Sequence, residues 1–363
     1  MKKCLAWLLA VSMIFSLFGC SPGSQSQQSP AESEAPALSA SKPSQQTEPV
    51  TETTQPVYDE PMFLKVSSIT FSLVGETDDI YLGLIPREAV SWESDDESVA
   101  VFQDGVLTAT GVGSTTVRAV CQDQQVECSV SCLAQTQEEL EALDPETLRA
   151  PKRLPPEVDL ETECSYFTES AIVGDSITYF LFQWESKYDY LGEVTFLARG
   201  GVSLNGFVKR FKNIYYRGQE VFLEKAIADS GVKKVYFMLG QNDLSSKART
   251  IVMDNWTELL SRIRELSPDV EIYLQSCIPE YARDSSVDEV NERIEQYNLT
   301  LREFARENDC HFIDLAYYVK DHFDRMPEIY SQGNYHMNEA GCLNWMKILR
   351  FYAQYELEGG ELI

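Results

Sequence analysis

The alternation of hydrophobic and polar positions first predicts strands. In residues 62–134, apolar and polar residues alternate, as in 68–73 and 116–120, which is the two-residue period of half-buried β-strands. Asp104-Gly105 separates two such runs and favours a hairpin turn. Short strands with frequent turns predict an all-β sandwich over residues 62–134.

From residue 169 the pattern changes to short apolar runs separated by amphipathic stretches of helical length. The apolar runs are 171–173, 194–197, 232–239, 270–274 and 311–315, and the amphipathic stretches include 251–266 and 287–308. This alternation predicts a parallel sheet covered by helices on both faces. Ligands of such sheets bind at the carboxyl ends of the strands, so we look for chemistry just after each strand.

Residues 135–168 connect these two parts. Residues 137–141 predict a short helix, and Pro151, Pro155 and Pro156 then interrupt regular structure.

The N-terminal segment shows neither the two-residue alternation of strands nor the amphipathic pattern of helices. Lys2 and Lys3 precede an apolar run that ends at Phe18, which is shorter than the about 20 residues of a membrane span. Such a run is typical of a secretory signal sequence. Residues 20–61 are rich in Ser, Gln, Pro, Thr and Glu and carry few large apolar groups, so we expect a disordered tether.

The tetrapeptide Leu17-Phe18-Gly19-Cys20 resembles a bacterial lipobox. The resemblance implies removal of a signal peptide at 1–19 and lipidation of Cys20. The expected location is the bacterial cell surface, with the protein anchored to the membrane through this lipid. An ordinary signal peptide with an incidental cysteine is the alternative.

Charge and cysteine content narrow the classes of function. The net charge is −27, and such an acidic surface argues against nucleic-acid binding. Seven cysteines follow Cys20, so at least one has no intramolecular partner. Cys121, Cys128 and Cys132 lie on one predicted hairpin, and the sequence allows a local disulfide between two of them as well as free thiols. Without CxxC pairs, we expect no metal site.

Three motifs follow predicted strands. After the first strand, Ser176 stands at a strand-to-helix turn, where helix-terminal N–H groups suit a developing oxyanion; the alternative is a helix-capping serine. After the second, Gly200-Gly201 lets backbone N–H groups approach a ligand. After the third, the Asn242 amide can donate to the same oxyanion, or the loop can cap the next helix.

A serine nucleophile needs a general base, and the chain has three histidines. His311 opens the fifth strand, at the end opposite the expected site. His322 lies in a polar segment. His336 lies in a loop after the fifth strand and before the C-terminal helical stretch. The predicted topology therefore favours His336.

These pieces, in this order, resemble the SGNH (GDSL-like) hydrolase superfamily. The matching segments are Gly174-Asp175-Ser176, Gly201 (or Gly200), Gly240-Gln241-Asn242-Asp243, and His336 followed by Asn338-Glu339-Ala340-Gly341. The resemblance covers residues 169–358. It implies a three-layer α/β/α flavodoxin-like domain, Ser176 as nucleophile, His336 as base, and an oxyanion hole from Ser176, Gly201 and Asn242. No cofactor is implied.

A second resemblance concerns residues 62–134. The run from Trp92 to Val117 is similar to a bacterial Ig-like domain of group 2. This similarity implies a spacer or a module that contacts the cell wall, rather than a catalyst.

The histidine block departs from the family pattern. The family usually carries Asp three residues before the histidine, where it orients the ring and stabilises the imidazolium. Here that position is Gly333, and its neighbours Gln332 and Asn334 are neutral. A Ser-His dyad is expected, with Gln332 or a backbone carbonyl holding the ring. Without a carboxylate, the pKa of His336 should stay near the free value of about 6.5.

The expected activity is that of an exported esterase that removes acyl groups, acetyl in the first place, from a carbohydrate or a cell-wall glycan or from a small ester. An O-acyltransferase acting on a glycan would use the same groups. A non-catalytic surface binding protein with a degenerate hydrolase fold is the third reading, and the missing aspartate is its support.

Overall fold

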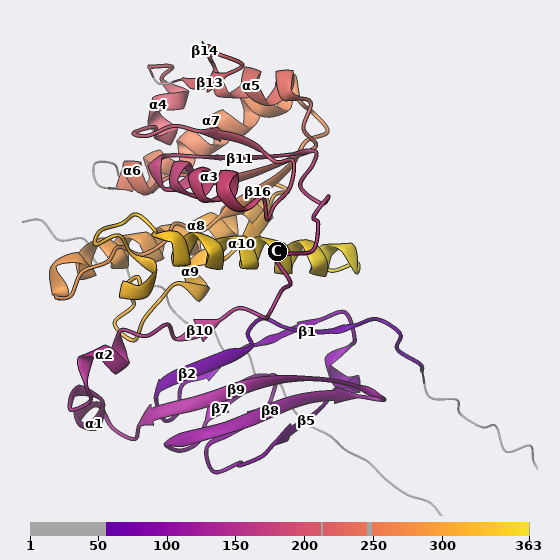
Figure 1. Cartoon of the computed structure of the whole chain (residues 1–363), viewed down its shortest axis with the longest axis vertical. Helices are drawn as coiled ribbons and strands as arrows, with labels where there is room; N and C mark the ends of the chain where they lie inside the picture. The colour runs from indigo at the N-terminus through magenta and orange to yellow at the C-terminus, as the bar shows by residue number, and fades with distance from the viewer. Residues whose placement is uncertain (1–55, 212, 245–248, 363) are drawn as a thin grey trace, which may run out of the picture. The chain divides into compact units, whose positions relative to one another are not determined.

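The computed structural model describes residues 56–211, 213–244 and 249–362 (Figure 1). The predicted signal peptide, Cys20 and most of the predicted tether lie outside these residues.

The N-terminal part is rich in β-strands. The strands are β1 (Met62–Leu64), β2 (Ser68–Leu73), β3 (Thr77–Asp78), β4 (Tyr81–Gly83), β5 (Ser91–Ser94), β6 (Ala100–Gln103), β7 (Val106–Ala109), β8 (Gly113–Cys121) and β9 (Gln124–Ala134). They form sheets of order β2-β9-β8-β5, β3-β7-β6 and β1-β4. The predicted hairpin turn at Asp104-Gly105 is confirmed, because it joins the antiparallel pair β6–β7. The Ig-like character of this region stays a prediction.

The seven cysteines among the described residues are free thiols. The register of β8 and β9 explains why the hairpin cysteines are unpaired. Cys128 lies opposite Val117, and Cys132 lies opposite Gly113. Cys121 lies opposite Gln124. No two of the three cysteines are therefore cross-strand partners.

The C-terminal part contains a five-stranded parallel sheet. Its strands are β11 (Ser170–Gly174), β12 (Thr195–Ala198), β15 (Lys234–Met238), β16 (Glu271–Gln275) and β17 (His311–Ile313), which lie in the order β12-β11-β15-β16-β17. All five runs that the hydrophobic pattern predicted are thus confirmed as strands. The order corresponds to 2-1-3-4-5, the flavodoxin-like arrangement, which places its switch point between β11 and β15.

The helices between these strands are α3 (Ser176–Tyr188), α4 (Leu204–Val208), α5 (Leu223–Ser230), α6 (Gln241–Leu244), α7 (Arg249–Leu266) and α8 (Asp288–Glu307), and α9 (Leu315–Tyr318) and α10 (Glu339–Leu357) follow the last strand. A small hairpin, β13 (Ile214–Tyr216) with β14 (Gln219–Val221), precedes α5. No helix within the described ranges is long and apolar enough to cross a membrane.

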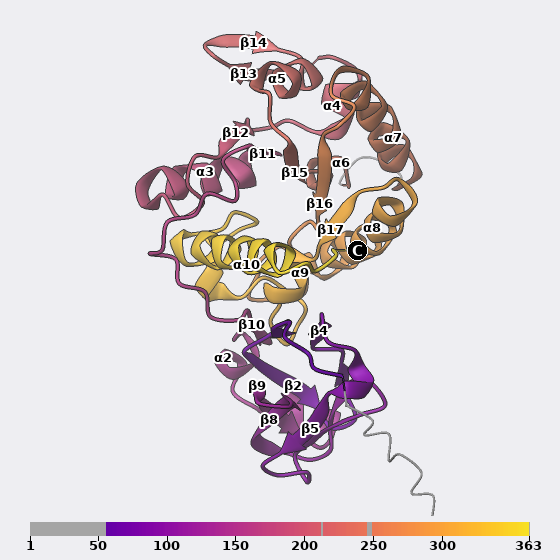
Figure 2. The ribbon, with the colours of Figure 1, turned by 90° about the vertical axis from the view of Figure 1, so that its right-hand side faces the viewer.

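The sheet is the middle of three layers. Successive residues of a strand point to opposite faces. On one face, Ile172 packs in a core with Leu181 of α3 and Trp345 of α10. On the other face, Val173 packs in a second core with Trp256 of α7. Figure 2 shows α3 and α10 on one side of the strands and α7 and α8 on the other. The α/β/α layering expected from the sequence is therefore observed.

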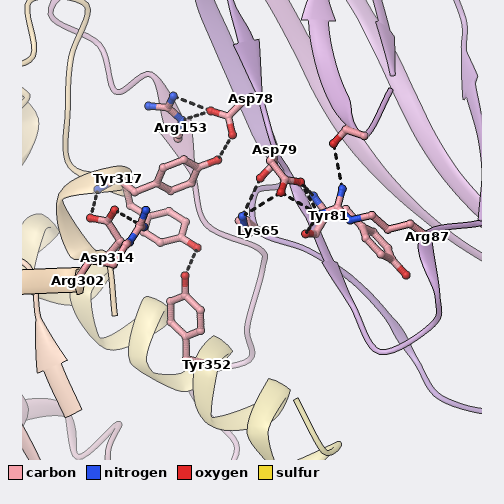
Figure 3. A network of polar contacts seen from close by, with 12 residues as sticks. Lys65, Asp78, Asp79, Tyr81, Arg87, Arg153, Arg302, Asp314, Tyr317 and Tyr352 are labelled. Atoms are coloured by element: carbon pink, nitrogen blue, oxygen red, sulfur yellow. Dashed lines mark hydrogen bonds and ion pairs between the residues drawn. The ribbon is translucent and has the colours of Figure 1, made fainter. Parts of the chain in front are cut away.

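The connector takes part in both regions. It carries the expected helix α1 (Gln137–Glu141), a second helix α2 (Pro145–Leu148), and strand β10 (Arg153–Leu154), which pairs with β2. Arg153 donates from Nε and Nη2 to one carboxylate oxygen of Asp78, at 2.9 and 2.6 Å. Tyr317 donates to the other oxygen at 2.7 Å (Figure 3). These contacts join the β-rich region to the segment after β17.

Candidate active site

Ser176 is placed by the turn from β11 into α3. Asp175 is the helix N-cap, and its carboxylate accepts a hydrogen bond from the Ile177 N–H at 2.9 Å. Ser176 is therefore the first residue of the helix, and the alternative in which it caps the helix is wrong. A Cβ at Gly174 would lie 1.9 Å from the Thr178 hydroxyl oxygen, so this tight turn requires glycine. The Ser176 side chain is left partly exposed at the carboxyl end of β11.

His336 reaches the same place from the loop before α10. Its Nε2 lies 3.0 Å from the Ser176 Oγ, although the two residues are 160 positions apart in the chain. The loop is closed by a bridge between Ser331 and Met337. Asn334 accepts a hydrogen bond from the His336 N–H at 2.7 Å, which fixes the backbone beside the imidazole. A base at this distance can take the serine proton.

Among the described residues, no carboxylate is hydrogen-bonded to the imidazole. Burial lowers the pKa of His336 below its usual value of 6.5, and no charged group offsets this effect. The sequence predicted a pKa closer to the free value than a neighbouring carboxylate would give; desolvation, which penalises the charged ring, moves the pKa below that value. Gln332 does not hold the ring, because its side chain donates to the Met337 carbonyl at 2.8 Å. Gly333 is exposed, with φ +95°.

Two aromatic side chains contact the imidazole instead. The ring centroid of Phe180 lies 4.8 Å from that of His336, and the centroid of Tyr335 lies 4.2 Å away. Phe180 lies one helical turn after Ser176, a spacing that is visible in the sequence and that could have indicated its role.

Asn242 contacts the neighbours in sequence of the other two proposed oxyanion residues, Ser176 and Gly201. The Asn242 side chain donates from Nδ2 to the Asp175 carboxylate at 2.9 Å and to the Val202 carbonyl at 2.8 Å. A side-chain amide has two N–H donors, so both are engaged. Asn242 thereby links the loops that carry Ser176 and Gly201, and it can donate to an oxyanion when one of these bonds is exchanged. Gly201 itself is exposed.

Two buried aspartates support these loops, and neither was expected from the sequence to have a role of its own. Asp243 accepts hydrogen bonds from the Leu204 N–H at 2.9 Å and the Asn205 N–H at 3.0 Å, at the start of α4. Asp175 is 2% exposed, and its burial raises its pKa to about 6. Their positions in the sequence, directly beside Ser176 and Asn242, could have indicated this supporting role.

The other two histidines lie elsewhere. His311 stacks on Tyr273 at the start of β17, with ring centroids 4.4 Å apart. His322 Nδ1 lies 2.8 Å from the Ser72 hydroxyl of the β-rich region. Within the described part of the chain, no group of three or more His, Cys, Asp or Glu side chains is arranged to hold a metal ion.

The chain is similar to several solved structures over about half of its length. A GDSL-like lipase from Bacteroides thetaiotaomicron is 14% identical, with 52% of this chain and 88% of that chain covered and a TM-score of 0.41. A catalytic mutant of an acetylxylan esterase from Geobacillus stearothermophilus is 16% identical, with 53% and 94% covered and a TM-score of 0.35. A member of the lipolytic protein G-D-S-L family from Veillonella parvula is 20% identical, with 52% and 96% covered and a TM-score of 0.35.

No curated protein matches the chain. The family model that does match describes the GDSL-like Lipase/Acylhydrolase family, and it matches residues 172–342. This range begins in β11, ends in α10 and contains Ser176, Asn242 and His336. Over residues 172–342 the chain is thus similar to the GDSL-like Lipase/Acylhydrolase family, a family of hydrolases.

Proposed function

We propose that the protein is a serine esterase that hydrolyses acyl esters through an acyl-Ser176 intermediate. The observation that carries this proposal is the 3.0 Å contact between the Ser176 Oγ and the His336 Nε2. It lies at the carboxyl ends of the parallel strands, where open α/β sheets bind their ligands. The match of residues 172–342 to an acylhydrolase family supports the same reaction class.

The chemistry follows from the placement of each group. As the Ser176 Oγ attacks the ester carbonyl, its proton passes to the His336 Nε2. The carbonyl oxygen becomes an oxyanion, which the N–H groups of Ser176 and Gly201 would stabilise, with Asn242 as the third donor. The imidazolium then gives its proton to the leaving alkoxide, and the acyl group stays on Ser176. Water, activated by the same imidazole, releases the acid.

The substrate and location are further parts of the proposal. We infer an acetyl ester on a carbohydrate or cell-wall glycan as the substrate. This inference rests on the expected lipid anchor at Cys20, the tether behind it and the β-rich region, which would hold the catalytic domain where polymers occur. The β-rich region would act as a spacer or contact the cell wall.

A glycan O-acyltransferase is the second candidate, because transfer differs only in the group that attacks the acyl enzyme. A non-catalytic binding protein is the third. The Ser176–His336 contact counts against it, because a degenerate site has no need of an aligned base.

The test combines labelling and turnover. Wild type and Ser176→Ala are treated with an active-site serine phosphonate probe and assayed on aryl esters, acetylated xylan and acetylated peptidoglycan. We expect labelling and acid release by the wild type alone. Transfer to an added glycan, seen by product analysis, would identify the acyltransferase. A folded wild type that neither labels nor turns over any of these esters would overturn the proposal.

A further inference from the structure

The imidazole of His336 has an unusual set of neighbours for a catalytic base. Its Nε2 faces the nucleophile, but within the described residues no hydrogen bond is made by its Nδ1. The side chain of Gln332 is engaged with the Met337 carbonyl, and Gly333 has no side chain. The ring must nevertheless be held, because a base works only when its lone pair points at the serine proton.

The contacts that remain are aromatic. Phe180 and Tyr335 lie 4.8 and 4.2 Å from the imidazole centroid, with interplanar angles of 48° and 45°. Centroid separations in this range are those of packed aromatic pairs. The two rings reach the imidazole from different elements, Phe180 from α3 and Tyr335 from the loop before α10.

We propose that Phe180 and Tyr335 are positioning residues that fix the orientation of the His336 ring, in the place of a hydrogen-bonding acid. The inference rests on the proposed function, in which His336 is the base. Contact with two rings restricts rotation about the Cβ–Cγ bond of the histidine, a torsion that is otherwise broad. Phe180 also links the base to the nucleophile, because it lies one turn after Ser176 on the same helix.

This arrangement supplies orientation without charge. An aspartate would both orient the ring and stabilise the imidazolium. Aromatic rings orient the imidazole and shield it from water, which agrees with a pKa for His336 that burial alone lowers. The base should therefore stay neutral, and active, at a more acidic pH than a free histidine.

The experiment removes each ring and follows both rate and pH dependence. Phe180→Leu keeps an apolar side chain, and Tyr335→Ala changes a residue that is 38% exposed. We expect each to lower kcat on an aryl acetate about tenfold, equivalent to ~1.4 kcal/mol, with little change in KM. The midpoint of the acidic limb should move to higher pH, because a more hydrated imidazole holds its proton more readily.

Matched variants separate positioning from packing. Phe182→Leu is the control on the same helix, because the Phe182 ring packs on Tyr179 and Phe196 rather than on His336. It should keep wild-type kcat and midpoint. Tyr335→Phe retains the ring and should restore both values. If Phe180→Leu fails to fold, the comparison of Tyr335→Ala with Tyr335→Phe still shows whether an aromatic ring positions His336. Folded ring-deletion variants that behave like Phe182→Leu would overturn the inference.

A readout independent of turnover distinguishes this inference from the proposed function. The imidazole of His336 is titrated by NMR in wild type and in both ring-deletion variants, with His336→Gln to assign the signal. We expect a rise in its pKa and loss of the ring-current shift in each variant. An unchanged signal refutes the aromatic contact, whereas absence of labelling and turnover in the wild type refutes the esterase.

Discussion

Protonation of His322 should weaken the contact between the β-rich region and the α/β domain. Its Nδ1 lies 2.8 Å from the hydroxyl of Ser72 on β2. Burial lowers the pKa of His322 from 6.5 to about 4, and the charges of Lys152 and Arg153 add to the effect. The folded protein therefore takes up this proton less readily than the unfolded chain does.

The sign and size follow from that difference in pKa. A basic group whose pKa is lower in the folded state than in the unfolded state destabilises the folded protein as the pH falls. For His322 this loss of stability begins near the unfolded pKa of 6.5 and continues down to about 4. Between about pH 7 and about pH 4.5, this one group should lower the free energy of unfolding by roughly 2 kcal/mol.

Two buried acids act in the opposite direction. Burial raises the pKa of Asp321 and of Asp175 to about 6. Their burial as anions destabilises the fold at neutral pH, and this cost decreases as the pH falls from about 6 to the ordinary value of 3.8. The pH dependence of the wild type alone is therefore a sum of opposed contributions, and a variant is needed to isolate His322.

His322→Gln provides that comparison, because glutamine can still hydrogen-bond Ser72 but does not titrate. Urea unfolding of both proteins is measured at about pH 7 and about pH 4.5. We expect similar stability at the higher pH and an advantage of roughly 2 kcal/mol for the variant at the lower pH. Equal losses of stability in the two proteins would show that His322 is not held neutral in the fold.

The remaining predictions concern the site and the anchor. Asn242→Ala should lower kcat by roughly 10²–10³ in steady-state assays, the usual loss for one oxyanion donor. Tm should also fall, because Asp175 and Val202 lose a hydrogen-bond donor; full activity in the folded variant would place the oxyanion on backbone donors alone. Gly333→Asp should move the midpoint of the pH–rate profile to higher pH, because a nearby carboxylate favours the imidazolium form of His336. The positive φ of residue 333 should cost the variant about 1 kcal/mol of stability. An unshifted profile in a folded variant means that residue 333 does not face His336. Cys20→Ala should release the protein from the membrane fraction or leave it unprocessed, as fractionation and mass spectrometry would show; unchanged retention argues against lipidation.

The period of the hydrophobic residues predicted most of the fold. Every apolar run after residue 169 became a strand of the parallel sheet, because a strand buried on both faces needs continuous apolar sequence. Strand β10 was not predicted. It has two residues, Arg153 and Leu154, and is bounded by prolines, so it carries no period of its own. It forms because β2 offers an edge that it can pair with.

The candidate site was predictable where residue type and strand position coincide. Topology brings Ser176, Asn242 and His336 to one edge of the sheet, and the order of the motifs was enough to select them. The surroundings of His336 were not predictable. Burial lowers its pKa, and Phe180 and Tyr335 pack on the imidazole. Both features depend on how the loop before α10 folds against α3, which no hydrophobic period describes.

The contacts of the β-rich region bear on its proposed role as a spacer. Asp78 is 9% exposed, and its carboxylate accepts hydrogen bonds from Arg153 and Tyr317. Phe63 packs edge-on against Phe351 and Tyr355 of α10, with centroids 6.2 and 5.5 Å away. Removing this region would uncover apolar surface on the helix that follows the His336 loop and leave Arg153 without its carboxylate. A spacer built in this way is part of the catalytic domain's fold rather than an independent module attached to it.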